Sequence, residues 1–177
     1  MNRTIVFLAV LAALAIGIFY FLNYVQPPGG GFSDTTGVNK ENLIHYRNAE
    51  GFEFDYPYYF KVDEQPSEYP DLKAAFVAVY PDTVEIIQAA RSNESADQVE
   101  SEIASILRTE EKNTLIQGKT SNARITMYQT NWFGGKAYSR FALFSCGSDT
   151  RILHMVIPVA FQQDLKTANY ITSTFKC

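Results

Sequence analysis

Residues 51–57 read Gly-Phe-Glu-Phe-Asp-Tyr-Pro, a stretch that alternates aromatic and acidic side chains. In an extended chain Phe52, Phe54 and Tyr56 fall on one face, and the two acidic residues fall on the other. A period of two is typical of a strand with one buried face. The stretch therefore predicts a half-buried β-strand near the start of a folded domain.

Further runs of β-branched and aromatic residues follow this strand and predict a sheet. Residues 72–80 and 84–90 are joined by Pro81-Asp82, a turn signal, and should form a hairpin. Strands are also expected at residues 114–118, 123–130, 136–146 and 151–159.

Two helices are predicted beside this sheet. Ser95 is a favourable N-cap, and Gln98 three residues later completes a capping box. The second helix is expected near residues 161–174, which carry an apolar stripe. Because residues 142–144 and 152–157 are apolar on both faces, both faces of the sheet should be covered. The fold class predicted is α+β, an α/β/α sandwich with a central antiparallel sheet.

Ahead of this domain, residues 5–22 read IVFLAVLAALAIGIFYFL and contain no charge. At about 1.5 Å per residue, a helix of this run spans roughly 27 Å, close to the apolar thickness of a bilayer. Arg3 precedes the run, and no Lys or Arg follows it until Lys40. The positive-inside rule then leaves the N-terminus in the cytoplasm and the domain outside.

Residues 1–25 are therefore expected to be an uncleaved signal anchor, with residues 5–25 in the lipid bilayer of the cell membrane. A cleaved signal peptide is the alternative, but its apolar region is usually shorter and ends in small residues. Residues 26–41, rich in Pro and Gly, are expected to be a flexible linker. Residues 42–177 have the size of one ordinary domain.

The chain has two cysteines, Cys146 and Cys177, and both lie on the outer side of the expected anchor. An even number of cysteines in an oxidising compartment suggests a disulfide, here closing a loop of about 30 residues. The alternative is that Cys146 is a small buried apolar side chain and Cys177 belongs to a frayed end.

No motif in the sequence carries recognisable catalytic chemistry. His45 and His154 are the only histidines, and neither has the spacing typical of a zinc site. The sequence has no G-x-S-x-G, no P-loop and no dinucleotide-binding glycine motif. We therefore expect no catalytic residues, no metal and no cofactor. The net charge of −4 and the absence of a basic stripe argue against nucleic-acid binding.

The strongest candidate for an interface is Asn131-Trp132-Phe133, which is followed by two glycines in a predicted turn. Trp132 is the only tryptophan of the chain. Exposed aromatic residues on a loop often anchor a protein interface or contact a membrane surface. The alternative is that Trp132 folds back and covers one end of the core.

The domain also resembles a known family. Gly51-Phe52-Glu53-Phe54-Asp55-Tyr56-Pro57, shortly after Tyr46-Arg47, is similar to the opening of PsbP-like domains, although Phe60 stands where a Trp is usual. The closing Ile171-Thr172-Ser173-Thr174-Phe175-Lys176 resembles the ending of small bacterial members. The resemblance covers residues 45–177 and implies an α/β/α sandwich.

The resemblance also implies a docking or assembly module, since the family is known mainly for binding to larger complexes. We therefore expect a non-catalytic, membrane-anchored domain that docks on another envelope protein. An extracytoplasmic enzyme with a site built from scattered residues is one alternative. A small-ligand carrier with a pocket between sheet and helix is the other.

The mature protein should keep its anchor. Intact-mass spectrometry of protein purified from membranes should give about 19.9 kDa, the mass of the full chain. A mass lower by roughly 25 residues would instead show a cleaved signal peptide.

Overall fold

The computed structural model describes residues 31–64, 71–81, 83–107, 115–161 and 164–177. Within these residues no helix is both long and apolar enough to cross a bilayer. The expected anchor, residues 1–25, lies outside the described residues. One compact unit runs from Phe32 to Cys177.

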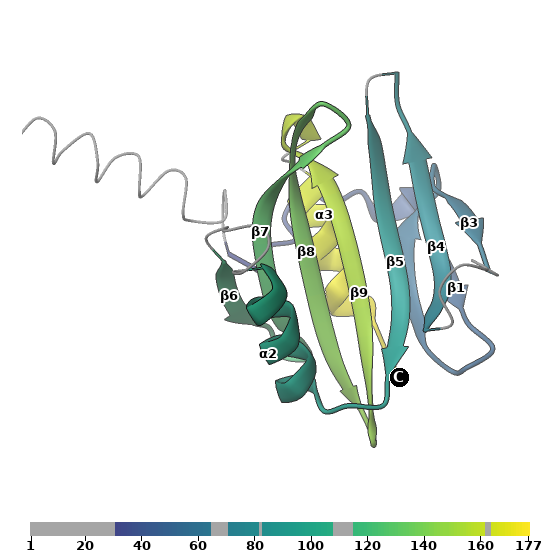
Figure 1. Ribbon diagram of the computed structural model, residues 1–177. Coiled ribbons are helices and arrows are strands. Elements are labelled where there is room, and N and C mark those ends of the chain that lie inside the picture. The colour runs from purple at the N-terminus through teal and green to yellow at the C-terminus, as the bar shows by residue number, and fades with distance from the viewer. Residues whose placement is uncertain (1–30, 65–70, 82, 108–114, 162–163) are drawn as a thin grey trace, which may run out of the picture. The chain divides into compact units, whose positions relative to one another are not determined.

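A seven-stranded sheet forms the centre of this unit, in the order β3-β4-β5-β9-β8-β7-β6 (Figure 1). All neighbouring strands run antiparallel. The long strands β5, β9 and β8 lie in the middle, so most of their backbone groups are paired on both sides. The strands are β3 (Lys61–Asp63), β4 (Leu72–Val79), β5 (Val84–Ser92), β6 (Ile116–Lys119), β7 (Arg124–Trp132), β8 (Gly135–Cys146) and β9 (Asp149–Pro158).

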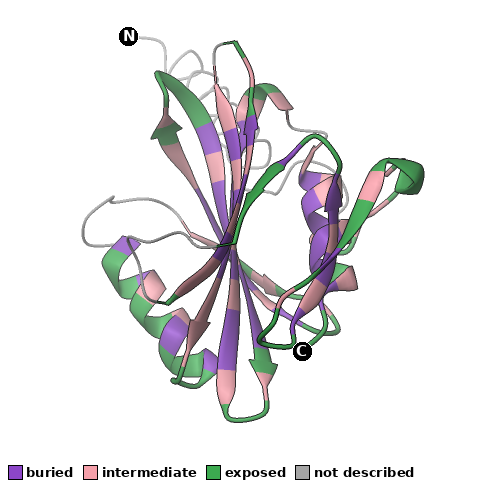
Figure 2. Ribbon diagram, turned by 90° about the vertical axis from the view of Figure 1, so that its right-hand side faces the viewer, coloured by how far each residue is buried: buried purple, intermediate pink, exposed green. Residues whose placement is uncertain are grey.

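The two helices lie on opposite sides of this sheet (Figure 2). Helix α2 (Ala96–Ile106) packs on Leu143 through Ala96 and Val99. Helix α3 (Asp164–Thr174) covers the other face with Leu165, Ala168 and Ile171. The predicted antiparallel sheet with two helices is confirmed.

A separate two-stranded sheet shares the face that α3 covers, a feature that the sequence did not predict. It consists of β1 (Leu43–Arg47) and β2 (Glu53–Pro57). The rings of Tyr46 and Phe54 lie 5.0 and 5.2 Å from the ring of Phe76 on β4. Strand β1 escaped prediction because only one of its five side chains, Tyr46, is buried.

The side chains of residues 52–56 alternate between buried and partly exposed positions, as predicted. Phe52, Phe54 and Tyr56 are buried, whereas the two acidic residues between them are partly exposed. Each buried aromatic ring contributes about 1.5–3 kcal/mol of transfer free energy. This strand therefore fixes the two-stranded sheet against the main one.

The capping box predicted for α2 is present. The Ser95 side chain accepts a hydrogen bond from the backbone of Gln98, whose side chain accepts one from the Ser95 backbone. The box satisfies amide groups that the first turn of a helix leaves unpaired. The capping box therefore marks the point where the connection from β5 stops and helix α2 begins.

The packed body begins earlier than residue 42, so the described part of the expected linker needs correction. Phe32 packs against the core and lies directly over Gly118, where an added Cβ would come within 2.4 Å of its ring. The Asp34 carboxylate lies 3.1 Å from Lys166 of α3. The Asp34 carbonyl accepts a hydrogen bond of 2.9 Å from Asn169. Phe32 and Asp34 therefore tie this segment to the core and to α3.

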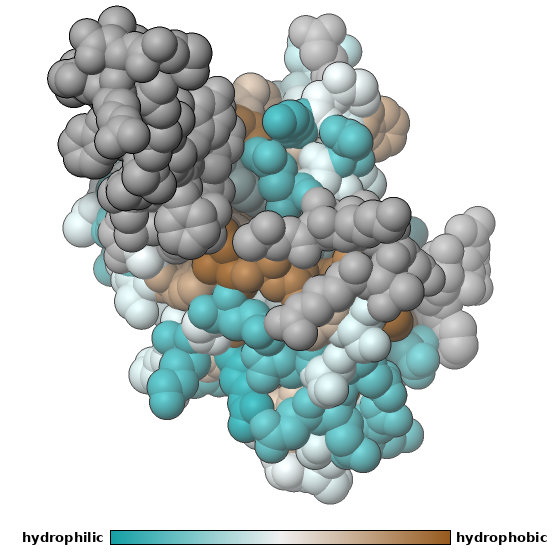
Figure 3. All heavy atoms as spheres, turned by 60° about the vertical axis from the view of Figure 1, so that its left-hand side comes forward, coloured by the Kyte–Doolittle hydropathy of each residue, from teal (hydrophilic) through white to brown (hydrophobic). Residues whose placement is uncertain are grey.

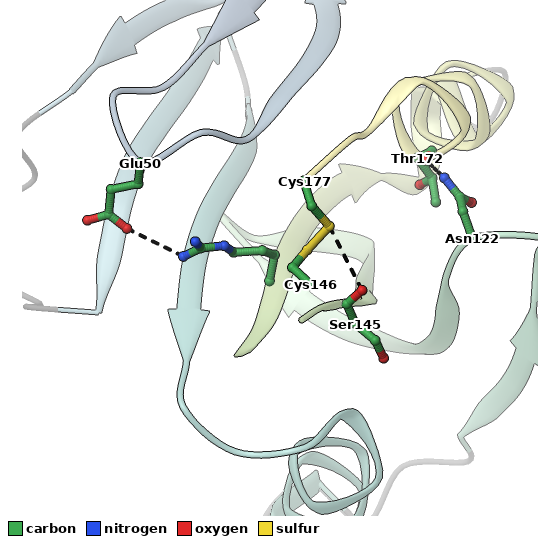
Figure 4. Close-up of a disulfide and its surroundings, with 7 residues drawn as sticks. Glu50, Asn122, Ser145, Cys146, Thr172 and Cys177 are labelled. Atoms are coloured by element: carbon green, nitrogen blue, oxygen red, sulfur yellow. Dashed lines mark hydrogen bonds and ion pairs between the residues drawn. A yellow bond between two sulfur atoms is a disulfide. The ribbon is translucent and has the colours of Figure 1, made fainter. Parts of the chain in front are cut away.

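A disulfide joins Cys146, at the end of β8, to Cys177 (Figure 4). The two Cα atoms are 5.6 Å apart, a normal separation for a disulfide. Beside it, the backbones of Lys176 and Glu53 exchange two hydrogen bonds of 2.8 and 3.0 Å. The last residues are therefore tied both to the main sheet and to β2.

Breaking this bridge should destabilise the domain. Cys146→Ser, Cys177→Ser and the double variant should each lower the free energy of unfolding by about 3–4 kcal/mol, because the unfolded chain regains loop entropy. Urea denaturation under non-reducing conditions measures the loss. The double variant should lose no more than a single variant, since all three break the same bond. Losses that add up in the double variant would contradict this account.

Candidate functional site

The hairpin between β7 and β8 carries the residues of the predicted interface. Trp132 is partly buried, and its Nε1 donates a hydrogen bond of 3.0 Å to the carbonyl of Val84 on β5. Phe133 is 68% exposed and adopts a positive φ of 43°, which turns the chain back into β8. Asn131 is exposed beside them. Trp132 is thus turned inward as an anchor, while Phe133 projects outward.

A second exposed apolar residue lies at the same end of the sheet. Val79 of β4 is 73% exposed and pairs with Val84, the residue that Trp132 contacts. Figure 1 shows the β7–β8 hairpin curving toward the connection between β4 and β5. We call Val79, Trp132 and Phe133 the hairpin-tip surface. An apolar surface on a hydrogen-bonded scaffold is suited to binding a partner with little ordering.

On the α3 face, two carboxyl groups meet in a buried position. Glu85 of β5 is 3% exposed, and its Oε2 accepts a hydrogen bond of 3.1 Å from the Tyr80 hydroxyl. No donor of a described side chain or backbone reaches its Oε1. Asp164 of α3 lines the same small cavity of about 20 Å³. Protonation of one of the two carboxyl groups would provide a donor for the hydrogen bond that Oε1 lacks.

The electrostatics of this pair agree with a shared proton. Burial, followed by the nearby Asp164 carboxyl, raises the pKa of Glu85 to about 8. Burial also raises the pKa of Asp164. The cavity beside them holds about one water molecule, so it has no room for a substrate. The sequence did contain a signal for this site, because Glu85 follows the same period-two phase as the buried Ile87 and Ala89.

On the side of the sheet that carries α2, the side chains of Ser139, His154 and Gln88 form a hydrogen-bonded row. The Ser139 hydroxyl lies 2.7 Å from His154 Nε2, and His154 Nδ1 lies 2.9 Å from the side-chain oxygen of Gln88. Burial lowers the pKa of His154 to about 4, so the ring is neutral at neutral pH. The row resembles a nucleophile, a base and an orienting group. Ser139 is only 1% exposed, however, so a substrate cannot reach its hydroxyl.

Arg140 is a buried cation that ties α3 to the sheet. Its guanidinium donates to the Ala168 carbonyl, the Thr172 hydroxyl and the Asn169 side-chain oxygen, at 3.1, 2.6 and 3.2 Å. None of these acceptors carries a charge. Desolvation lowers the pKa of Arg140 to about 9, so it is still protonated at neutral pH.

A groove of about 360 Å³ lies between α2 and the sheet. The side of the molecule nearest β6 and α2 shows hydrophobic atoms gathered in a band across its middle (Figure 3). The groove is lined from α2, from the strands beside it and from the turn before the helix by Leu72, Gln88, Ala90, Ser92, Glu94, Val99, Glu102, Ile103, Ile106, Phe141, Ile152 and His154.

Among the described residues, no group of three or more His, Cys, Asp or Glu side chains is arranged to hold a metal ion, and this includes both histidines. His45 is exposed on β1, with its Nδ1 2.8 Å from Asp55, and this hydrogen bond raises its pKa. His154 is hydrogen-bonded to Ser139 and Gln88. The structure brings Cys146 to Cys177 and Trp132 to Phe133, but it does not bring these two sets of residues together.

No protein-family model matches this sequence, and no curated protein matches it. Cyanobacterial PsbP (CyanoP) from Synechocystis sp. PCC 6803 superposes with a TM-score of 0.54 at 13% identity, over 85% of this chain and 99% of that one. This likeness shows a PsbP-like fold.

Two other solved structures give weaker superpositions, which carry no argument. A protein from Bacteroides thetaiotaomicron has a TM-score of 0.46 at 15% identity, over 71% of this chain and 44% of that one. A protein of unknown function from Pseudomonas aeruginosa has a TM-score of 0.31 at 13% identity, over 72% of this chain and 90% of that one.

The buried carboxyl pair should make stability depend on pH. The folded state keeps a proton on Glu85 up to pH about 8, whereas the unfolded chain releases it near the ordinary pKa of 4.5. The free energy of unfolding should therefore fall between pH 5 and 8, by at most about 1.4 kcal/mol per pH unit.

Glu85→Gln should remove most of this fall, because the amide does not titrate. Thermal unfolding at several pH values measures the effect, with Glu41→Gln as a matched exposed control that keeps the wild-type slope. A Glu85→Gln variant with the same pH slope as the wild type would show that the pair does not hold this proton.

Proposed function

We propose that this chain is a membrane-anchored extracytoplasmic binding or scaffolding domain that docks on an envelope protein complex and has no catalytic activity. Residues 1–25 supply the anchor, and the hairpin-tip surface supplies the contact with the partner. The Cys146–Cys177 disulfide supports a position outside the cytoplasm, because structural disulfides persist in oxidising compartments.

The observation that carries this proposal is the geometry of the hairpin tip. Phe133 is 68% exposed, although a buried ring would be worth about 1.5–3 kcal/mol more to stability. The hydrogen bond from Trp132 to Val84 holds the tip against β5, so binding would cost little conformational entropy. An aromatic side chain held outward on a fixed hairpin has the character of an interface anchor.

The fold agrees with this proposal, and the exposed hairpin tip gives it a basis in this chain's own residues. The sequence resembles PsbP-like domains at its two ends, and the structure has a PsbP-like fold. The family is known mainly for binding to larger complexes, so the sequence resemblance and the fold both favour a docking module.

The enzyme alternative finds less support among the described residues. Ser139 is hydrogen-bonded to a histidine but is closed to substrate, and Glu85 opens only onto a cavity of about 20 Å³.

The carrier alternative is favoured by one specific observation, the groove between α2 and the sheet.

Site-specific photo-cross-linking in native membranes tests the docking proposal. A photoreactive phenylalanine analogue placed at Phe133 or at Val79 should give the same cross-linked protein of defined mass. The same analogue at Ser148, an exposed position in the turn at the opposite end of β8, is the control and should not give it. Cross-links to lipid alone, or equal capture at all three positions, would contradict docking through this surface.

The affinity of the captured partner gives a quantitative check. Phe133→Ser should weaken binding about tenfold or more, the usual effect of removing an aromatic anchor. The variant should unfold at the temperature of the wild type, because an exposed side chain contributes little to stability. An unchanged affinity would show that Phe133 is not the anchor.

A further inference from the structure

The groove between α2 and the sheet has an apolar interior. Ala90 and Ile152 belong to neighbouring strands at its floor, and Val99 and Ile103 line it from α2. Its volume of about 360 Å³ falls within the range of about 300–1,000 Å³ that is typical of small-molecule sites. The groove is therefore large enough for a ligand of modest size.

One part of this floor is aromatic. The rings of Phe141 and His154 stack at a centroid distance of 4.2 Å with an angle of 5° between their planes. Both residues line the groove. Flat aromatic surfaces attract other rings and also cations, because the ring face is electron-rich.

The charged residues among the described lining of the groove are both acidic. Glu94 and Glu102 line it and are exposed, and no ion pair with a described residue neutralises either carboxylate. The described lining residues include no Lys or Arg. His154 adds no positive charge at neutral pH, because burial lowers its pKa to about 4.

The polar side chains that line the groove in the described part of the chain carry no positive charge. Both ring nitrogens of His154 are engaged, one with Ser139 and the other with Gln88. An anionic ligand would therefore meet two carboxylates and no cationic donor. A cation with an apolar body would bury its body on the floor and place its charge near the carboxylates.

We propose that this groove binds a small ligand with an aromatic or alkyl body and a positively charged amine head. The body packs on Phe141 and Ile152, and the ammonium group lies by Glu94 and Glu102. This site is separate from the hairpin-tip surface, so it is independent of the proposed docking function.

The two histidines of the chain provide a direct test. The full chain is placed in phosphatidylcholine nanodiscs with ¹³C-labelled histidine, and the two ring signals are followed by NMR at pH 7. His154 reports on the groove, whereas exposed His45, on the opposite side of the sheet, is an internal control. The probes are 2-phenylethylamine, 2-phenylethanol and phenylacetate, which share a phenyl ring and differ in charge.

We expect 2-phenylethylamine to shift the His154 signal saturably and to leave the His45 signal in place. It should bind about tenfold more tightly than phenylacetate, with the neutral alcohol between them. Free ligand is measured after dialysis, so that partition into lipid does not enter the affinities.

Variants then separate charge from shape. Glu94→Gln with Glu102→Gln should reduce the preference for the amine to about twofold or less, while Glu41→Gln at another exposed position should not change it. Ala90→Phe should block all three probes by filling the floor. The glutamine variants change only exposed side chains, so the test does not depend on the folding of Ala90→Phe.

Three results would overturn the proposal: no saturable shift at His154, equal binding of amine and carboxylate, or parallel shifts of both histidine signals. None of them bears on cross-linking at the hairpin tip, so the two proposals fail separately.

Discussion

The stacking of Phe175 on Phe144, with ring centroids 3.9 Å apart, holds the two ends of this domain together. Phe175 also packs on Phe52 and Phe54, at 5.9 and 6.1 Å, so one ring joins the C-terminus, the two-stranded sheet and β8. The disulfide joins the residues two positions after each of these rings, and the backbone pair between Glu53 and Lys176 lies beside it, so both hold the stacking in place. These three segments, together with helix α3, close the apolar face of the main sheet.

The same face contains ionisable groups that a simple apolar core would lack. Arg140 donates three hydrogen bonds to neutral acceptors on α3, while its Nε has no hydrogen-bond partner among the described residues. Glu85 accepts a hydrogen bond from Tyr80 and lies beside a second carboxyl group, that of Asp164. Buried charges of this kind rarely add stability, but a misplaced partner leaves them unpaired at a cost of several kcal/mol, on the order of 3–5. They therefore restrict α3 to one position along the sheet.

The face of the main sheet that carries α2 is only partly covered. Helix α2 is eleven residues long and packs beside β7 and β8, so it leaves the part of the face near β5 open as a groove. The hairpin tip projects from the end of that sheet because Phe133 and Gly134 both adopt positive φ angles. One fold thus carries two surfaces with different chemistry, an apolar tip and an acidic groove.

Sequence pattern alone determined the elements whose period or end signals are local. The alternation in residues 51–57, the Ser95 capping box and strands β4 to β9 of the sheet depend on neighbours within a few residues, and these could be predicted. Short β3, whose three residues are all exposed, was not predicted. The packing of Phe32 on Gly118 and the pairing of short β1 depend on distant partners, and the sequence assigned Phe32 to a linker. The meeting of Glu85 with Asp164, and the groove beside α2, exist only because the sheet brings together residues far apart in the chain. Local pattern decides which face a side chain occupies, whereas tertiary packing decides which partner it meets there.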